Sequence, residues 1–207
     1  MDTSRIAELL LPFHLDLDPL QLGLISTYVD LLERWNARMN LTAVRDRESI
    51  VTRHFAESLF AARRLFPSPP GVAHLLDLGS GAGFPGLPMR IWNPALRLTL
   101  IEANQKKSIF LREVVRALAL GNTEVFNARA ETYPSATADV VTLRAVERFD
   151  QVLPVAKSLL APGGRLALLI STAQQPTAVQ LLPELRWNPP EPVPRSTSRI
   201  LLVGHPQ

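Results

Sequence analysis

The 207-residue sequence contains no cysteine, and this absence removes several kinds of chemistry. Without a thiol the chain can form no disulfide, no thiolate metal site and no cysteine nucleophile. Histidine is also scarce, and none of the four has a metal-binding spacing such as HExxH: His14, His54, His74 and His205. We therefore expect no bound metal, and the missing cysteines agree with a cytoplasmic protein.

The sequence also lacks long apolar runs and a basic leader. No stretch approaches the roughly 18 consecutive apolar residues that a membrane-spanning helix requires. The N-terminal stretch MDTSRIAELLLPF opens with an acid after the methionine and lacks a basic n-region, so no signal peptide is predicted. We expect no membrane partner, and 207 residues suit one large domain or a domain with an extension.

Lysine is rare beside arginine. Only Lys106, Lys107 and Lys157 are lysine, and the other nineteen of the 22 basic residues are arginine. Arginine is the better ligand for phosphates and base edges, but a GC-rich genome explains the same bias. The net charge of +3 at pH 7 therefore permits nucleic-acid binding without establishing it.

Two patterns of apolar spacing divide the chain. Residues 1–68 are predicted to form an N-terminal helical extension, with one amphipathic stretch over 46–66 and a linker at 68–71. Over residues 69–207 strands alternate with helices, which predicts an α/β fold with a doubly wound, mostly parallel sheet. We expect this domain and the N-terminal extension to form one compact unit. The strand candidates are 73–78, 96–101, 124–127, 139–143 and 165–171, with 199–203 as an antiparallel edge. The helix candidates are 87–92, 105–118 and 151–160, and Asn104 is expected to cap the second of them.

The segment DLGSGAGFPG, residues 77–86, directly follows the first strand candidate and predicts a ligand-binding loop. Glycines allow a tight turn and let a ligand approach the backbone closely. The segment fits both G-x-G-x-G and the dinucleotide pattern G-x-G-x-x-G, and either pattern alone is weak evidence. We predict that Gly79, Ser80, Gly81 and Gly83 bind a nucleotide-like cofactor.

Three features favour S-adenosylmethionine over NAD. The carboxylate of Asp77 suits the ammonium group of S-adenosylmethionine, although a hydrogen-bond acceptor that caps the loop is the alternative role. Pro85 lacks an N–H group, which makes the loop a poor phosphate cradle. A Pro-Gly-Gly turn at 162–164, before the fifth strand candidate, is typical of methyltransferase domains.

Further candidates follow the other strands. Glu102 ends the second strand, where a carboxylate can accept both ribose hydroxyls of an adenosine cofactor. The backbone of Ala130 and Glu131, after the third strand, would flank the adenine, unless these residues only start a solvated helix. Arg144 ends the fourth strand, where it can hold guanine O6, a phosphate or the cofactor carboxylate, with a structural ion pair as the alternative.

Four segments carry a family resemblance: DLGSGAGFPGLP (77–88), YVDLLERWNARMNLTAV (28–44), RHFAESL (53–59) and KKSIFLREVV (106–115). Together they resemble the RsmG (GidB) family of bacterial small-subunit rRNA guanine-N7 methyltransferases, over about residues 20–170. The resemblance implies a class I methyltransferase fold, S-adenosylmethionine as methyl donor, and N7 of a guanine in the decoding-region loop of 16S rRNA as acceptor. The positions that match the family's cofactor contacts are Gly79, Phe84, Glu102, Ala103, Asn104, Ala130, Glu131 and Arg144.

The sequence departs from the family pattern at two positions. The family has Asp where this chain has Glu57, and Ser where it has Leu143. Neither change removes Arg144, so both concern the positioning of the substrate base more than activity itself.

Methyl transfer to guanine N7 requires no general base, because this atom carries a free lone pair and no proton. Proximity and alignment then provide most of the catalysis. We expect a monomer whose partner is the small ribosomal subunit, and some basic residues are hypothesised to contact rRNA phosphates: Arg45, Arg47, Arg53, His54, Lys106 and Lys107. A solvated basic face is the alternative for the cations, and a satisfied core histidine for His54.

Two other functions remain open from the sequence. One is a methyltransferase of the same fold that acts on a small molecule or a protein. The other is an NAD-dependent oxidoreductase that uses the overlapping G-x-G-x-x-G pattern, although no substrate domain with an acid–base residue is recognisable.

Overall fold

The computed structural model describes residues 1–67, 73–146 and 148–206. The helices are α1 (Thr3–Leu10), α2 (Pro19–Asn36), α3 (Arg47–Ile50), α4 (Glu57–Leu65), α5 (Gly86–Trp92), α6 (Gln105–Ala117), α7 (Phe149–Ser158) and α8 (Gln175–Leu181), with short helical turns η1 (Leu11–Phe13), η2 (Val51–Ala56), η3 (Ala130–Thr132) and η4 (Thr172–Gln174). The strands are β1 (His74–Leu78), β2 (Arg97–Ile101), β3 (Thr123–Phe126), β4 (Ala138–Arg144), β5 (Leu160–Ser171), β6 (Leu185–Trp187), β7 (Glu191–Pro192) and β8 (Arg199–Pro206). The expected linker at 68–71, and with it the expected boundary of the extension, lies outside the described residues.

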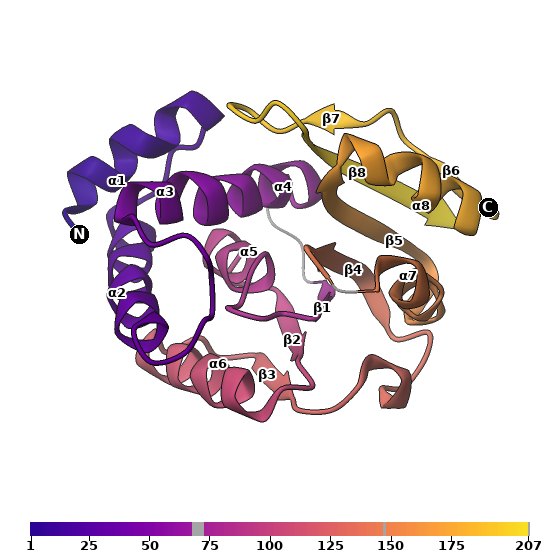
Figure 1. Cartoon of the computed structure of the whole chain (residues 1–207), viewed down its shortest axis with the longest axis horizontal. Coiled ribbons are helices and arrows are strands. Elements are labelled where there is room, and N and C mark those ends of the chain that lie inside the picture. The colour runs from indigo at the N-terminus through magenta and orange to yellow at the C-terminus, as the bar shows by residue number, and fades with distance from the viewer. Residues whose placement is uncertain (68–72, 147, 207) are drawn as a thin grey trace.

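The strands form one sheet in the order β3-β2-β1-β4-β5-β8-β6, with β7 beside β8 (Figure 1). Strands β1 to β5 are parallel, and β8 runs antiparallel to β5, which confirms the mostly parallel sheet and its antiparallel edge. The chain builds outward from β1 to β3, then returns to the other side of β1 to form β4. Ligands of such sheets bind where this order reverses, beside the carboxyl ends of the strands.

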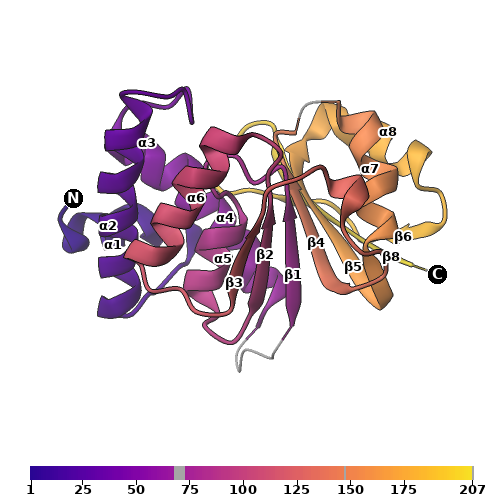
Figure 2. The same ribbon diagram turned by 90° about the horizontal axis from the view of Figure 1, so that it is seen from below.

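Helices cover both faces of the sheet. Figure 2 shows α4, α5 and α6 on one face and α7 and α8 on the other. Neighbouring strand residues alternate between the two apolar cores, as in β5, where Leu166 packs in the α7–α8 core and Ala167 in the core of the N-terminal helices. The core on the N-terminal side extends from Ile6 to Leu201, so the helical extension and the sheet share one interior.

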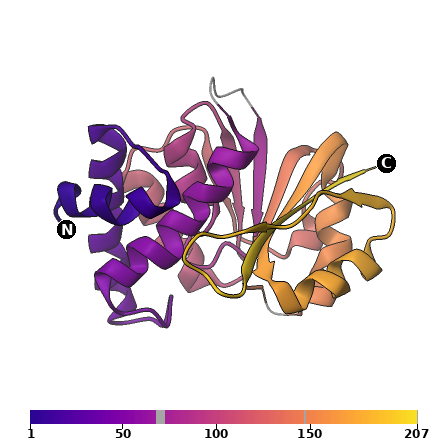
Figure 3. The same ribbon diagram turned by 90° about the horizontal axis from the view of Figure 1, so that it is seen from above.

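The N-terminal helices are tied to the sheet by specific contacts. Asp18 caps α2 in a capping box with Gln21, whose side chain also donates to the Ile91 carbonyl at the end of α5 over 3.0 Å. Elements α3, η2 and α4 form one helical stretch that confirms the prediction over 46–66, with a π-helical turn at η2. Figure 3 shows this stretch lying along the sheet, on the side of the N-terminus.

The structure differs from the sequence predictions mainly near the C-terminus. The Pro-Gly-Gly segment at 162–164 lies within β5 rather than before it, and the pairing of β4 with β5 shifts register between Ala138 and Val140. Gly163 accommodates this irregularity with a φ of +77°. Elements α8, β6 and β7 were not predicted, because none exceeds seven residues and such short segments carry little periodicity.

Candidate active site

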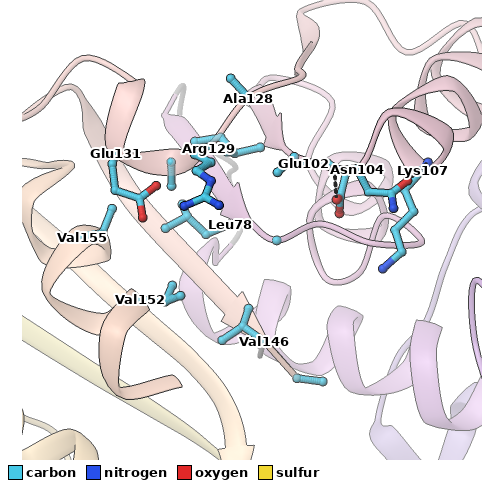
Figure 4. A pocket seen from close by; sticks show the side chains of 15 residues that line it. Leu78, Glu102, Asn104, Lys107, Ala128, Arg129, Glu131, Val146, Val152 and Val155 are labelled. Atoms are coloured by element: carbon cyan, nitrogen blue, oxygen red, sulfur yellow. Dashed lines mark hydrogen bonds between the residues drawn. The ribbon is translucent and has the colours of Figure 1, made fainter. Parts of the chain in front are cut away.

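The carboxyl ends of the strands border a cavity of about 470 Å³, called here the strand-end cavity. Gly79, after β1, and Ala145, after β4, both line it, as does Val155 of α7. Figure 4 shows the charged side chains of Glu102, Arg129, Glu131 and Lys107 around this space. The remaining lining residues are Leu78, Ile101, Ala103, Asn104, Ala128, Ala130, Val146 and Val152. An apolar floor with a few polar groups is typical of a site for a small organic ligand.

Glu102 is held by backbone donors at the end of β2. Its Oε2 atom accepts a hydrogen bond from the Gly81 N–H over 2.9 Å, and its Oε1 atom accepts from the Asn104 N–H over 2.7 Å. A carboxylate offers about four acceptor positions, so acceptor capacity remains for a ligand. The glycine loop and the start of α6 thus fix a carboxylate that borders the strand-end cavity.

Four further residues predicted to contact the cofactor lie in the same cavity. Ala103 and Asn104 follow Glu102, and Asn104 caps α6 by accepting from the N–H groups of Lys106 and Lys107, as predicted. Ala130 and Glu131 belong to the short turn η3 after β3 and line the opposite wall. From the sequence, Ala130 and Glu131 were assigned to the cofactor by their position after the third strand, and Ala103 and Asn104 by the family resemblance.

The glycine loop borders a second space, the loop cavity, of about 230 Å³. Gly79, Lys107 and Ala145 line both cavities, so the two spaces adjoin. The other lining residues are Leu41, Thr42, His54, Ser80, Gly81, Ala82, Phe84, Arg144 and Arg199. Among the candidates, Gly79 lies where the two cavities adjoin, and Ser80, Gly81 and Phe84 line the loop cavity.

Asp77 lines neither of these cavities. Its side chain is fully buried, its Oδ1 atom accepts from the Thr142 hydroxyl over 3.0 Å, and its Oδ2 atom accepts from the Gly86 N–H over 3.1 Å. Burial raises the pKa of this carboxyl group to about 7. These bonds match the alternative role weighed for Asp77, a hydrogen-bond acceptor that holds the loop, rather than a direct contact with a cofactor ammonium group.

Gly83 also faces away from both cavities. Its φ is +87°, and an added Cβ atom would overlap the Tyr28 hydroxyl and Leu87 Cδ1. The Tyr28 hydroxyl donates a hydrogen bond to the Ala82 carbonyl, so α2 reaches into the loop at this point. The bare backbone at Gly83 thus serves the close approach of Tyr28, whereas the sequence pattern had suggested an approach by the ligand.

Arg144 forms the centre of a charged cluster beside the loop cavity, defined here as the arginine cluster: Arg144, Glu57, His54 and Arg199. The Nη2 atom of Arg144 donates to Glu57 Oε2 over 2.9 Å, to His54 Nδ1 over 3.1 Å and to the Arg53 carbonyl. Its Nη1 atom is buried and has no hydrogen-bond partner among the described residues. Burial lowers the pKa of Arg144 to about 10, which leaves the group cationic at neutral pH.

The hydrogen bonds of His54 define its protonation. An arginine can only donate, so His54 Nδ1 is the acceptor of the bond from Arg144, and Nε2 carries the proton toward Thr42 Oγ1 over 2.8 Å. Burial and the neighbouring arginines lower the pKa of His54 to about 3. The ring is therefore neutral, and it stacks on Phe84 with centroids 5.0 Å apart.

The residues hypothesised to contact RNA are not equivalent in the structure. Arg47 pairs with Asp30 and Glu33, so much of its charge is compensated. Arg45 binds the Asn36 carbonyl and Asn40 Oδ1. By contrast, Arg53 and Lys106 are exposed and form no ion pair with another described residue, and Lys107 lines both cavities.

The two departures from the family pattern lie in different surroundings. Glu57 joins the two arginines of the arginine cluster, since its Oε2 atom accepts a hydrogen bond from Arg144 and another from Arg199 Nη1 over 2.8 Å. Leu143 is fully buried in the α7–α8 core, away from both cavities. The longer acid at Glu57 is thus the departure that bears on the site.

Sequence reasoning missed Arg199 and Arg129. Arg199 was assigned only to an edge strand, and its approach to Glu57 joins residues 142 positions apart. Arg129 precedes the predicted adenine-flanking residues, and this position was its only local signal.

In the part of the chain that the structure describes, no helix is long and apolar enough to span a membrane, and no three His, Cys, Asp or Glu side chains gather as a metal site.

Comparisons with known protein sequences match one family. The family model described as rRNA small subunit methyltransferase G matches residues 21–181. A protein named Ribosomal RNA small subunit methyltransferase G from Chloroflexus aggregans is 45% identical over 144 residues, covering 67% of this chain and 59% of that protein. The protein of the same name from Xanthomonas campestris pv. campestris is 45% identical over 140 residues, covering 67% and 64%. The chain thus spans less than two thirds of the length of these two relatives.

Solved structures share the fold at low sequence identity. The crystal structure of P. horikoshii TYW2 in complex with MeSAdo aligns with a TM-score of 0.61 and 16% identity, covering 74% of this chain and 62% of that one. At this identity the likeness concerns the fold alone. It confirms the predicted class I S-adenosylmethionine-dependent methyltransferase fold.

Proposed function

Since the chain belongs to the rRNA small subunit methyltransferase G family, we propose that it transfers a methyl group from S-adenosylmethionine to N7 of a guanine in the decoding-region loop of 16S rRNA. The observation that supports guanine N7 as the methyl acceptor is the protonation state of His54 in the loop cavity. Its pKa of about 3 and its two engaged ring nitrogens make it unsuitable as a general base. Guanine N7 needs no base, whereas an amino or hydroxyl acceptor must lose a proton.

S-adenosylmethionine would supply the methyl group on a sulfonium centre. The strand-end cavity fits its adenosine part, because the braced Glu102 carboxylate keeps acceptor capacity for the ribose hydroxyls. The backbone at Ala130 and Glu131 would flank the adenine. Gly79 and Gly81 would let the amino-acid part pass toward the loop cavity.

The loop cavity would hold the target nucleotide. The free Nη1 donor of Arg144 suits an oxygen acceptor of that nucleotide, such as guanine O6. Transfer of the methyl group from the sulfonium to N7 would move positive charge to the purine. A neutral His54 adds no repulsion at this step, and Glu57 compensates part of the charge of Arg144. The chain would thus act by alignment and by electrostatics.

The proposal includes action in the cytoplasm, because the proposed substrate, the small ribosomal subunit, is a cytoplasmic particle, and the expected monomer stays a prediction. Among the RNA-contact candidates, Arg53, Lys106 and Lys107 are favoured. Arg47 is instead paired with Asp30 and Glu33, and the guanidinium of Arg45 already bonds to Asn36 and Asn40. The contacts of the three favoured residues would be with phosphates.

The direct test is to incubate the protein with labelled S-adenosylmethionine and small subunits purified from a methylation-deficient strain. Label in 7-methylguanosine from 16S rRNA is expected, and Arg144→Ala should reduce this label at least tenfold, since it removes the buried donor. Arg97→Ala is the matched control, because Arg97 is exposed at the amino end of β2, on the opposite edge of the sheet. Protein that binds the cofactor but labels no rRNA nucleoside would refute the proposal in favour of a small-molecule or protein substrate.

A further inference from the structure

Arg199 enters the loop cavity from a part of the chain beyond the family match. It is the first residue of β8, whereas the match ends at residue 181. Its Nη1 atom donates to Glu57 Oε2 over 2.8 Å, the same oxygen that accepts from Arg144 over 2.9 Å. One carboxylate oxygen therefore holds two guanidinium groups side by side at the cavity wall.

Both guanidinium groups retain unused donors. Arg144 makes its three hydrogen bonds through Nη2, which leaves the buried Nη1 atom without a partner among the described residues. The side chain of Arg199 is 31% exposed, and neither its Nε nor its Nη2 atom bonds to another described residue. A buried donor without a partner is costly, so this wall favours a ligand that supplies oxygen acceptors.

The charges around the loop cavity favour an anion. Lys107, Arg144 and Arg199 line it, His54 is neutral, and none of its lining residues is acidic. Glu57 lies behind the two arginines and compensates only one positive charge. An arginine fork of this kind binds phosphate oxygens well.

The place of Arg199 in the sheet separates it from the adenosine end of the proposed cofactor site. Residues that follow β1, β2, β3 and β4 line the strand-end cavity, and Arg199 does not, because β8 lies beyond β5 in the sheet (Figure 1). A phosphate of the target nucleotide is therefore the ligand that this position suits, rather than a group on the adenosine.

We propose that Arg199 binds a phosphate of the target nucleotide, and that Glu57 positions Arg199 beside Arg144 for this contact. The inference rests on the proposed function, since it assumes that the substrate is a nucleic acid. Arg199 would touch the substrate directly, while Glu57 would act through the two arginines.

The experiment compares Arg199→Ala with Arg186→Ala. Arg186 is an exposed residue of β6, the strand next to β8, and it lines none of the cavities described above, so its loss removes the same charge from the same part of the sheet. For each variant the affinity for small subunits, its dependence on salt, and the affinity for S-adenosylmethionine are measured separately from turnover.

Arg199→Ala should weaken small-subunit binding about tenfold and lower the slope of log affinity against log salt by about 1, as the loss of one phosphate contact predicts. Cofactor affinity should stay within about twofold of wild type, because the proposed contact involves RNA. Arg186→Ala should match wild type in every measurement. A merely structural loss at Arg199 would not change the salt slope selectively, and Arg199→Lys should restore the slope but only part of the affinity.

Two results would overturn the inference. In one, Arg199→Ala binds small subunits with the affinity and salt slope of Arg186→Ala. In the other, it loses affinity for S-adenosylmethionine while binding of the subunit is unchanged, which would assign the guanidinium to the cofactor. Neither result depends on turnover, so failure of wild-type methylation would refute the proposed function and remain distinguishable from failure at Arg199.

Discussion

The packing of Gly83 under Tyr28 leads to a quantitative prediction for Gly83→Ala. The φ of +87° is a conformation that alanine adopts only with strain, at a cost of about 1–2 kcal/mol. The added methyl group would also overlap the Tyr28 hydroxyl and Leu87 Cδ1 and come within 3.2 Å of Leu111 Cδ2. Overpacking of a buried site costs about 1–3 kcal/mol more.

Together these effects should lower the free energy of unfolding by about 2–5 kcal/mol. For a chain of this length the midpoint of thermal unfolding should then fall by about 4–20 °C. Two other glycines separate the causes. Gly163 has a φ of +77° but no atom near an added Cβ, so Gly163→Ala should cost only the strain, about 1–2 kcal/mol.

Gly23 completes the comparison, because it lies inside α2 with no atom within 4 Å of an added Cβ. Gly23→Ala should therefore raise stability by about 0.5–1 kcal/mol through better helix propensity. The assay is urea unfolding followed by circular dichroism, with equal m-values required for the comparison. If Gly83→Ala is no more destabilising than Gly163→Ala, the packing argument for the loop is wrong.

Two further predictions concern the site. Glu102→Ala should weaken S-adenosylmethionine binding at least tenfold in calorimetry, because charge-assisted hydrogen bonds contribute about 1.5–3 kcal/mol each. Glu131→Ala should change this affinity little, since only the backbone of Glu131 is proposed to flank the adenine. Equal losses of affinity in the two variants would contradict the assignment of Glu102. His54 has a depressed pKa in the folded state, so its stabilising contribution is present above pH 6.5 and is lost as the pH falls toward 3. The free energy of unfolding of wild type minus that of His54→Gln should fall by about 2 kcal/mol between pH 6.5 and pH 5. A difference that stays constant over this range would show that the ring is not held neutral.

Local patterns in the sequence determined the parallel sheet and its strand ends. Glu102 was identified because a carboxylate that ends the second strand can accept both ribose hydroxyls of an adenosine cofactor, and two backbone donors hold it in place. Asn104 was recognised as a cap because capping depends on the next two or three residues only. A strand end and a helix cap are each defined within a few residues of the chain, so a local pattern records them.

Only the tertiary structure decided which polar groups are satisfied by the protein itself. Asp77 was expected near a cofactor ammonium group, but Thr142, 65 residues away, and the Gly86 N–H engage its carboxylate. Arg199 meets Glu57 across 142 residues, and no local spacing encodes that approach. A hydrogen bond between distant residues depends on how helices and strands pack, and packing follows from the whole set of buried side chains rather than from any one segment.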